Sequence, residues 1–269
     1  MPLNILVISV CGREDRREHI KKILDGLHFD FIDAVTPHSI EYVQYMDQKP
    51  IFSGSPHPVE ICCAISHQKA WRNIVALGRP AVILEDDVTL RRGFRQFLAG
   101  GEKLKDFALY HLGGMEGLVE AELLVTAREK PPHIIGGNEF RKVIGAEGYL
   151  LRTCGYALTP VTAQAILQGV AGRFIVADRW NQIAEMSKLR GMLVCSLVRH
   201  PYFSSTSSIE LNRILAKSKS QIYKSIVSYS FRYGILFNIM KTSKHLIRRL
   251  SLWYVSGMMR KIYLQSRLR

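Results

Sequence analysis

Apolar stretches of strand length alternate with amphipathic stretches of helix length through the first two thirds of the chain. Residues 4–10, "NILVISV", are largely apolar, which is typical of a strand buried on both faces. Residues 13–27 follow with apolar positions spaced three and four apart, the pattern of an amphipathic helix. Residues 29–35 are again strand-like. A strand, a helix and a strand in succession favour a parallel α/β sheet.

The alternation continues as far as residue 198. The pattern predicts further strands, which cover residues 81–85, 107–114 and 192–198. It also predicts further helices, which cover residues 59–78, the second half of 147–167, and 176–191. Gly78 and Gly191 are expected to end helices, and Thr159 to cap a helix that begins at Pro160.

Two stretches interrupt this pattern. Residues 47–58 are rich in Pro, Gly and Ser and are predicted to form a loop. Residues 115–145 contain Pro131-Pro132 and short strand-like pieces, and are predicted to form irregular insertions near a ligand. The hydrophobic content of 47% in 269 residues supports one packed domain with an appendage and argues against wholesale disorder.

Charge divides the chain at residue 210. All 23 acidic residues lie at or before Glu210, and residues 211–269 carry 13 basic residues and no acidic one. The body, residues 1–210, therefore has a net charge of only +1. We predict a domain over 1–210 and a basic α-helical tail over 211–269 whose partner is an anionic surface.

The tail has the pattern of an amphipathic helix. One helix face is formed by Ile247, Leu250, Tyr254, Met258 and Ile262. No uncharged apolar stretch of about 18 residues occurs, so a spanning helix is not expected. The first interpretation is a helix on an anionic membrane surface, and the alternative is a helical pair packed on the body with a solvated basic side. Five cysteines without metal-ligand spacing are interpreted as reduced core residues of a cytoplasmic protein.

The stretch "AVILEDDVTL", residues 81–90, places three carboxylates at the end of an apolar strand. Alternate residues of an extended segment point the same way, so Glu85 and Asp87 could share a cation while Asp86 faces elsewhere. Hard cations such as Mg²⁺ and Mn²⁺ prefer oxygen ligands, and ligands gather at the carboxyl ends of strands in α/β sheets. An ordinary acidic turn that caps the next segment is the competing interpretation.

The surrounding residues resemble glycosyltransferase family 25, the lipooligosaccharide-biosynthesis glycosyltransferases. The resemblance covers residues 4–210 in consistent order. It rests on the helix and acidic strand of 59–90, with matching residues Glu60, Cys63, Ser66, His67, Trp71, Glu85, Asp86 and Asp87. It extends to the residues after the first strand, to a Gly-Tyr segment and to a later acidic segment, with matching residues Arg13, Arg16, Arg17, Gly155, Tyr156 and Asp178.

The resemblance implies a GT-A-like fold, an inverting transfer, and a nucleotide-sugar donor that is often UDP-galactose. It implies Mn²⁺ or Mg²⁺ bound by Glu85 and Asp87, with a third ligand after the last strand left open. Asp178 becomes the candidate general base, with Glu185 as a substitute. Donor contacts are assigned to Arg13, Arg16, Ser66, His67, Asp86, Gly155 and Tyr156. The implied acceptor is a lipid-linked saccharide of lipooligosaccharide or lipopolysaccharide, which places the enzyme on the inner face of the cytoplasmic membrane.

Simpler interpretations stand beside these roles. His67 and Trp71 fit a helix face packed in the core, and the arginines fit a solvated helix face. Asp178 fits a carboxylate that favours a helix N-terminus, and Gly155-Tyr156 fits a turn beside a core aromatic. A non-catalytic nucleic-acid-binding protein is a competing class, but the near-neutral body argues against nucleic acid as a partner. A transferase with another donor sugar or acceptor, and a family member without turnover, are further alternatives.

Overall fold

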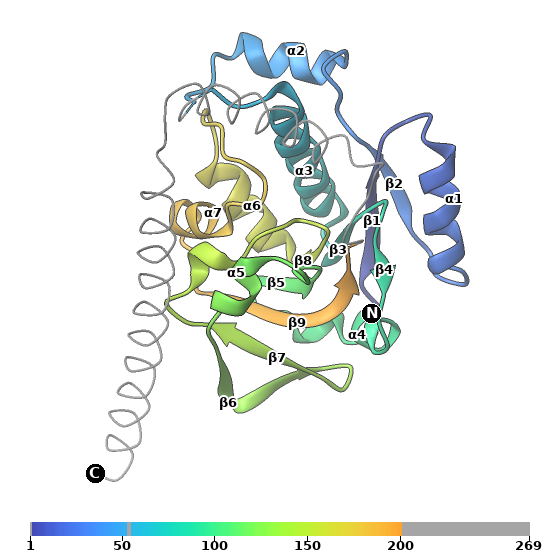
Figure 1. The fold of residues 1–269 in the computed structure, drawn as a ribbon, viewed down its shortest axis with the longest axis vertical. Helices are drawn as coiled ribbons and strands as arrows, with labels where there is room; N and C mark the ends of the chain where they lie inside the picture. Colours follow the sequence, from blue (N-terminus) through green and yellow to red (C-terminus); the bar gives the residue numbers. More distant parts are fainter. Residues whose placement is uncertain (1, 53–54, 201–269) are drawn as a thin grey trace, which may run out of the picture. The chain divides into compact units, whose positions relative to one another are not determined.

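The computed structural model describes residues 2–52 and 55–200, so the predicted tail, residues 211–269, lies outside the described residues. Nine strands of this part form one sheet, in the order β2-β1-β3-β8-β5-β9-β7-β6, with β4 paired to β9 off that path (Figure 1). The strands are β1 Asn4–Ser9, β2 Asp30–Asp33, β3 Ala81–Glu85, β4 Thr89–Leu90, β5 Ala108–Gly113, β6 Thr126–Ile135, β7 Asn138–Val143, β8 Gly155–Leu158 and β9 Gly191–Arg199.

The sheet is mixed, so the prediction of a mainly parallel sheet is wrong: three of the eight strand pairs are parallel and five are antiparallel. β1 runs parallel to β2 and β3, and β5 runs parallel to β9. β8 lies between β3 and β5 and is antiparallel to both, and the pairs β4–β9, β6–β7 and β7–β9 are also antiparallel. An apolar strand such as β8 has the same hydrophobic pattern in either direction, so the sequence does not reveal which way it runs.

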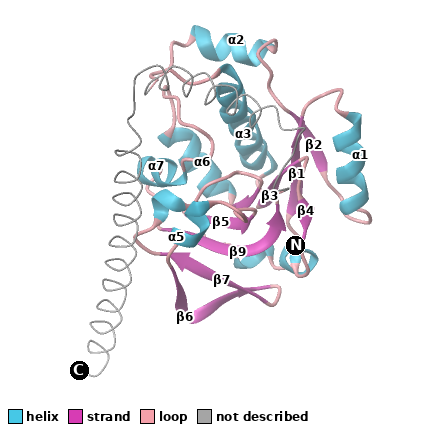
Figure 2. Cartoon of the chain, in the orientation of Figure 1, coloured by secondary structure: helices cyan, strands magenta, loops and turns pink. Residues whose placement is uncertain are grey.

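Seven α-helices of the described chain flank the sheet (Figure 2). They are α1 Glu14–Ile23, α2 Ile40–Asp47, α3 Pro58–Leu77, α4 Phe94–Leu98, α5 Val119–Leu123, α6 Pro160–Gly169 and α7 Trp180–Met186. Alternate residues of β1 face the two larger of the three hydrophobic clusters. Ile5 and Val7 pack in a cluster with residues of α1 and α4, whereas Leu6 and Ile8 pack with residues of α3, α6 and α7. The predicted α/β class is confirmed as a sheet with helices on both faces.

Helix α3 begins and ends as its sequence predicts. Its start carries a capping box, in which the His57 side chain accepts the Val59 N–H at 3.2 Å and the Glu60 carboxylate accepts the His57 N–H at 3.1 Å. Gly78 ends it with φ of 61°, a left-handed value that glycine adopts without strain. The 20-residue helix therefore presents a fixed face to the sheet.

Other boundaries differ from prediction. Helix α7 ends at Met186, and Gly191 is the first residue of β9 and not a helix end. Helix α2 was not predicted, since none of its residues is buried. Residues 126–143 form the β6–β7 hairpin and not irregular insertions; its register shifts between Arg128 and His133, around the two prolines that cannot donate to a ladder. All five cysteines are free, but Cys11 is exposed and is not a core residue.

Thr159 caps helix α6, as predicted. Its Oγ1 accepts the Thr162 N–H at 3.2 Å and donates to Asp106 Oδ1 at 2.6 Å, and the side chain is buried. We expect Thr159→Ala to lower the free energy of unfolding by about 1–2 kcal/mol, measured by chemical denaturation. Thr89→Ala, at an exposed strand position, is the control and should change it by less than about 0.5 kcal/mol. Equal effects of the two variants would contradict the capping role.

No helix of the described residues has the length and apolar character needed to cross a membrane.

Candidate metal centre

The acidic turn after β3 meets the end of β9. Strand β4 follows the turn and pairs with β9 antiparallel, with Thr89 opposite Arg199. This register brings His200 beside the turn, where its Nε2 lies 3.7 Å from Asp87 Oδ2. Glu85, Asp87 and His200 each offer one ligand atom, and the three atoms lie within 4.8 Å of one another. His200 is therefore the candidate for the third ligand that the sequence left open.

Asp87 is the residue of this triad whose surroundings most disfavour its charged form. Burial and the neighbouring Glu85 carboxylate raise its pKa above the ordinary value of aspartate, because both disfavour the charged form. Its Oδ1 is buried and has no hydrogen-bond partner among the described residues. Two carboxylates and an imidazole are ligands that Mn²⁺ accepts, and Mg²⁺ accepts the carboxylates. The residues present therefore fit a divalent cation.

Glu85 is held as a carboxylate in spite of its surroundings. Burial would raise its pKa, but donors at its Oε1 outweigh burial and lower the pKa to about 2. Thr153 Oγ1 donates to Oε1 at 2.5 Å, and His67 Nε2 lies 3.6 Å from the same oxygen. The charged form that binds a cation is thus already favoured in the fold.

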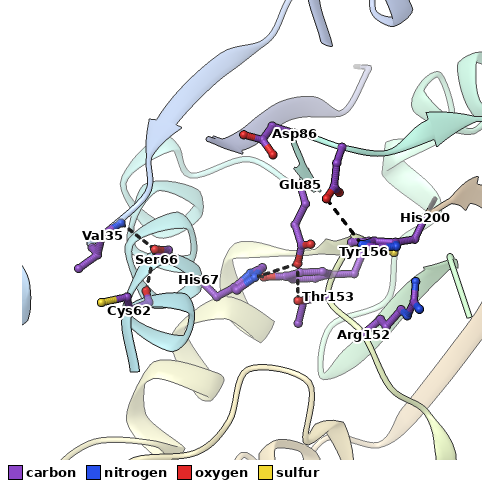
Figure 3. A network of polar contacts seen from close by, with 12 residues as sticks. Val35, Cys62, Ser66, His67, Glu85, Asp86, Arg152, Thr153, Tyr156 and His200 are labelled. Atoms are coloured by element: carbon purple, nitrogen blue, oxygen red, sulfur yellow. Dashed lines mark hydrogen bonds and ion pairs between the residues drawn. The ribbon is translucent and has the colours of Figure 1, made fainter. Parts of the chain in front are cut away.

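Two buried side chains, Trp71 and Tyr156, orient the buried His67. Figure 3 shows His67 beside Tyr156 and Glu85. Trp71 Nε1 donates to the Tyr156 hydroxyl oxygen at 2.8 Å, and that hydroxyl lies 2.8 Å from His67 Nδ1. Since the indole N–H can only donate, the hydroxyl is left to donate its own proton to Nδ1. The proton of a neutral His67 ring then sits on Nε2, facing Glu85. Trp71 and His67 are thus both core residues, and His67 also contacts the site.

Tyr156 and Gly155 lie in the core beneath the site. Tyr156 is 0% exposed, so its ring has no free face for a sugar. A Cβ on Gly155 would lie 2.9 Å from Val198 Cγ2, so the glycine allows β8 to approach β9 closely. Both residues act on the site through their packing and, for Tyr156, through His67.

Arg16 connects helix α1 to the acidic turn. Its Nη1 lies 2.7 Å from Asp86 Oδ1 and 3.4 Å from Asp87 Oδ2. Asp86 is 4% exposed, so this guanidinium offsets a carboxylate that is otherwise costly to bury. The pair gives Asp86 a definite partner and places one cation beside the metal centre.

Three other predicted residues are engaged elsewhere. Arg13 forms a bidentate pair with Asp15 at the exposed start of α1, at 3.0 and 2.8 Å. Arg17 pairs with Asp33 and lies over the Phe31 ring. Ser66 Oγ donates to the Cys62 carbonyl at 2.7 Å and accepts the Val35 N–H at 2.8 Å, which joins α3 to the segment after β2.

Asp178 lies in the turn before α7 and is partly exposed. Within the described part of the chain its carboxylate has no hydrogen-bond or ion-pair partner, and the side chain at the N-cap of α7 makes no capping bond. Trp180, two residues on, packs edge-on against Tyr156 with ring centroids 4.8 Å apart. This contact anchors the turn against the core under the metal centre. Glu185 is exposed on α7.

The Tyr156 hydroxyl connects the buried core to the candidate metal centre through His67, and a substitution can test this connection. We expect Tyr156→Phe to lower the free energy of unfolding by about 2–4 kcal/mol, because the Trp71 N–H and His67 Nδ1 lose their partner inside the protein. The metal affinity or activity should fall about 10-fold or more, as when other supports of metal ligands are removed.

A matched control separates the two effects. The buried Tyr110 hydroxyl contacts His133 Nε2 at 2.9 Å and accepts the Lys105 N–H at 2.9 Å. Tyr110→Phe should cost similar stability and leave metal affinity unchanged, measured by denaturation and by calorimetric titration with Mn²⁺. If both variants bind Mn²⁺ like the parent protein, the proposed support of Glu85 by His67 is wrong.

A divalent-cation site at the carboxyl end of a strand, with a guanidinium beside it, is typical of enzymes that act on phosphate-bearing substrates. The sequence profile described as glycosyltransferase family 25 (LPS biosynthesis protein) matches residues 3–179. The chain belongs to this family and is a glycosyltransferase. His200 lies beyond the matched residues.

Comparison of structures finds a crystal structure of a glycosyltransferase involved in the glycosylation of the major capsid of the virus PBCV-1. It shares 10% identity with this chain at a TM-score of 0.29, over 76% of this chain and 95% of that one. No curated protein sequence matches the chain. The GT-A-like form of the fold stays a prediction.

Proposed function

We propose that the protein is a metal-dependent, inverting glycosyltransferase that moves a hexose from a UDP-sugar to a saccharide acceptor of lipooligosaccharide or lipopolysaccharide. The observation that carries the proposal is the convergence of Glu85, Asp87 and His200, whose ligand atoms lie within 4.8 Å of one another. Membership of a family associated with LPS biosynthesis supports the acceptor class.

The proposal gives the triad one role. Glu85, Asp87 and His200 would hold Mn²⁺ or Mg²⁺, and the imidazole nitrogen favours Mn²⁺ of the two. A bound cation would offset the negative charge that develops on a departing diphosphate. Thr153 and His67 keep Glu85 charged and oriented for this role, and Arg16 limits the repulsion between Asp86 and Asp87.

Asp178 is the proposed general base. The acceptor hydroxyl oxygen would form a bond to the anomeric carbon as the bond from that carbon to the diphosphate oxygen breaks, and the hydroxyl proton would pass to the Asp178 carboxylate. A single displacement of this kind inverts the anomeric centre. The carboxylate suits the role because no described residue neutralises it, and Trp180 anchors its turn.

The basic tail, residues 211–269, is proposed to bring the enzyme to a lipid-linked acceptor. Its 13 basic residues would each contribute about 1 kcal/mol when close to anionic lipid at moderate salt. This would place the protein on the inner face of the cytoplasmic membrane.

A screen of nucleotide sugars with Mn²⁺, with Mg²⁺ and with EDTA tests the proposal. Release of nucleoside diphosphate is the readout, with UDP-galactose as the first donor. We expect turnover of a UDP-hexose that needs a divalent cation and is higher with Mn²⁺. Equal turnover in EDTA would remove the metal from the proposal, and turnover of another nucleotide only would correct the donor. If no nucleotide sugar is turned over, the result would count against the proposed transfer reaction.

A further inference from the structure

The segment that holds Thr153 beside Glu85 also carries a positively charged side chain, that of Arg152, which has no role in the proposed mechanism. Arg152 immediately precedes Thr153, whose hydroxyl donates to Glu85 at 2.5 Å. The Nη1 atom of Arg152 is buried and has no hydrogen-bond partner among the described residues. None of the ion pairs in the described part of the chain includes Arg152. A buried guanidinium nitrogen without an acceptor is costly, and such groups are rare in folded proteins.

The backbone at Arg152 is strained. Its φ is +67°, a left-handed value that residues other than glycine seldom adopt. Two ring N–H groups hold this conformation: Trp180 Nε1 donates to the Arg152 carbonyl at 2.8 Å, and His111 Nε2 lies 3.0 Å from the carbonyls of Leu151 and Arg152. Strained residues that their surroundings hold in place are concentrated at active sites and ligand clamps. The surroundings thus fix where the Arg152 side chain starts.

The guanidinium faces the metal centre. Figure 3 shows Arg152 on the side of Glu85 where His200 lies, with its guanidinium end turned toward His200. The Arg152 guanidinium has no anionic partner among the described residues. Because it lies beside a candidate cation site, an anionic group of a ligand can pair with it.

We propose that Arg152 binds the diphosphate of the nucleotide-sugar donor and stabilises that diphosphate as it leaves. The inference rests on the proposed function and adds a catalytic residue to it. A guanidinium offers two parallel N–H groups to phosphate oxygens, which a lysine ammonium cannot. The class of ligand is a diphosphate, because the adjoining triad would hold the cation that a diphosphate carries.

The variant Arg152→Gly tests the proposal with little risk of unfolding. Glycine adopts positive φ freely, so the variant should unfold at the same temperature as the parent protein or higher. We expect its affinity for inorganic pyrophosphate in saturating Mn²⁺, measured by calorimetry, to fall about 10- to 100-fold. Arg152→Asn, the next best residue in this conformation, should show the same loss. Affinity for Mn²⁺ alone should not weaken, because the triad is intact.

Lys188→Gly is the matched control. Lys188 also carries a positive charge at positive φ, 52°, but is exposed after α7. The Lys188→Gly variant loses the same charge and the same backbone strain as Arg152→Gly. It should bind pyrophosphate like the parent protein. If Arg152→Gly and Arg152→Asn bind pyrophosphate within twofold of the parent, or if Lys188→Gly loses as much as they do, the inference is overturned.

The readouts distinguish this inference from the proposed function. Pyrophosphate binding that depends on Arg152 would stand even if no sugar donor were turned over, in which case the proposed function alone would fail. Where a donor is turned over, Arg152→Gly should change kcat and the donor KM and leave the acceptor KM unchanged. An effect on the acceptor KM only would assign Arg152 to an anionic group of the acceptor and overturn the inference.

Discussion

Asp87→Asn should reduce transferase turnover about 10³-fold or more. The substitution keeps the shape of the side chain and removes the charge from the Asp87 carboxylate, whose Oδ1 atom is buried. A bound cation is worth several kcal/mol of transition-state stabilisation, and each 1.4 kcal/mol corresponds to about tenfold in rate. Turnover should be measured at saturating donor with Mn²⁺ varied, so that a loss of affinity is separated from a loss of rate.

The same variant should leave the metal-free fold intact. Asp87 is partly buried beside Glu85, so the amide removes a repulsion between like charges, and stability in EDTA should be unchanged or higher. The parent protein should gain about 2.7 kcal/mol at a Mn²⁺ concentration 100 times its Kd, and the variant should gain almost nothing. A variant that unfolds in EDTA, or that keeps parental turnover, would contradict the assigned role.

Asp178→Asn should reduce turnover about 10²- to 10⁴-fold, because the transfer loses the carboxylate that takes the acceptor proton. The metal centre does not include Asp178, so stabilisation by Mn²⁺ should equal that of the parent protein. Hydrolysis of the UDP-sugar, measured as UDP release without acceptor, should fall less than transfer if Asp178 takes the proton of the acceptor hydroxyl.

Glu185→Gln is the control for this assignment. Glu185 is the second carboxylate of the same segment and lies exposed on α7. Its variant should retain parental turnover. If Glu185→Gln loses activity and Asp178→Asn keeps it, the general base is Glu185, and if neither variant loses activity the base lies outside this segment.

The sequence predicted part of the candidate metal centre. Glu85 and Asp87 could be assigned because Glu85 ends a strand and Asp87 lies two residues later in the turn that follows, so they are close together in the chain. His200 could not, because its place depends on the pairing of the two-residue strand β4 with β9, a contact across 110 residues of chain. A two-residue strand has too short a pattern to be recognised.

Asp86 and Tyr156 illustrate a second limit. Residue type and spacing indicated that both belong near the site, yet not what they contact. Asp86 turns to Arg16 from helix α1, and Tyr156 lies beneath His67 in the core. Packing between elements decides such contacts, and neither hydrophobic period nor motif spacing encodes it. The direction of β8, which carries Tyr156 between β3 and β5, was hidden for the same reason.

Anomalous diffraction from a crystal of the protein with Mn²⁺ and UDP, recorded at the manganese absorption edge, tests the central claim most directly. The account predicts one strong anomalous peak bonded to Glu85, Asp87 and His200, with the UDP diphosphate completing its coordination. A peak held by other residues, or UDP bound with no manganese at the acidic turn, would contradict it.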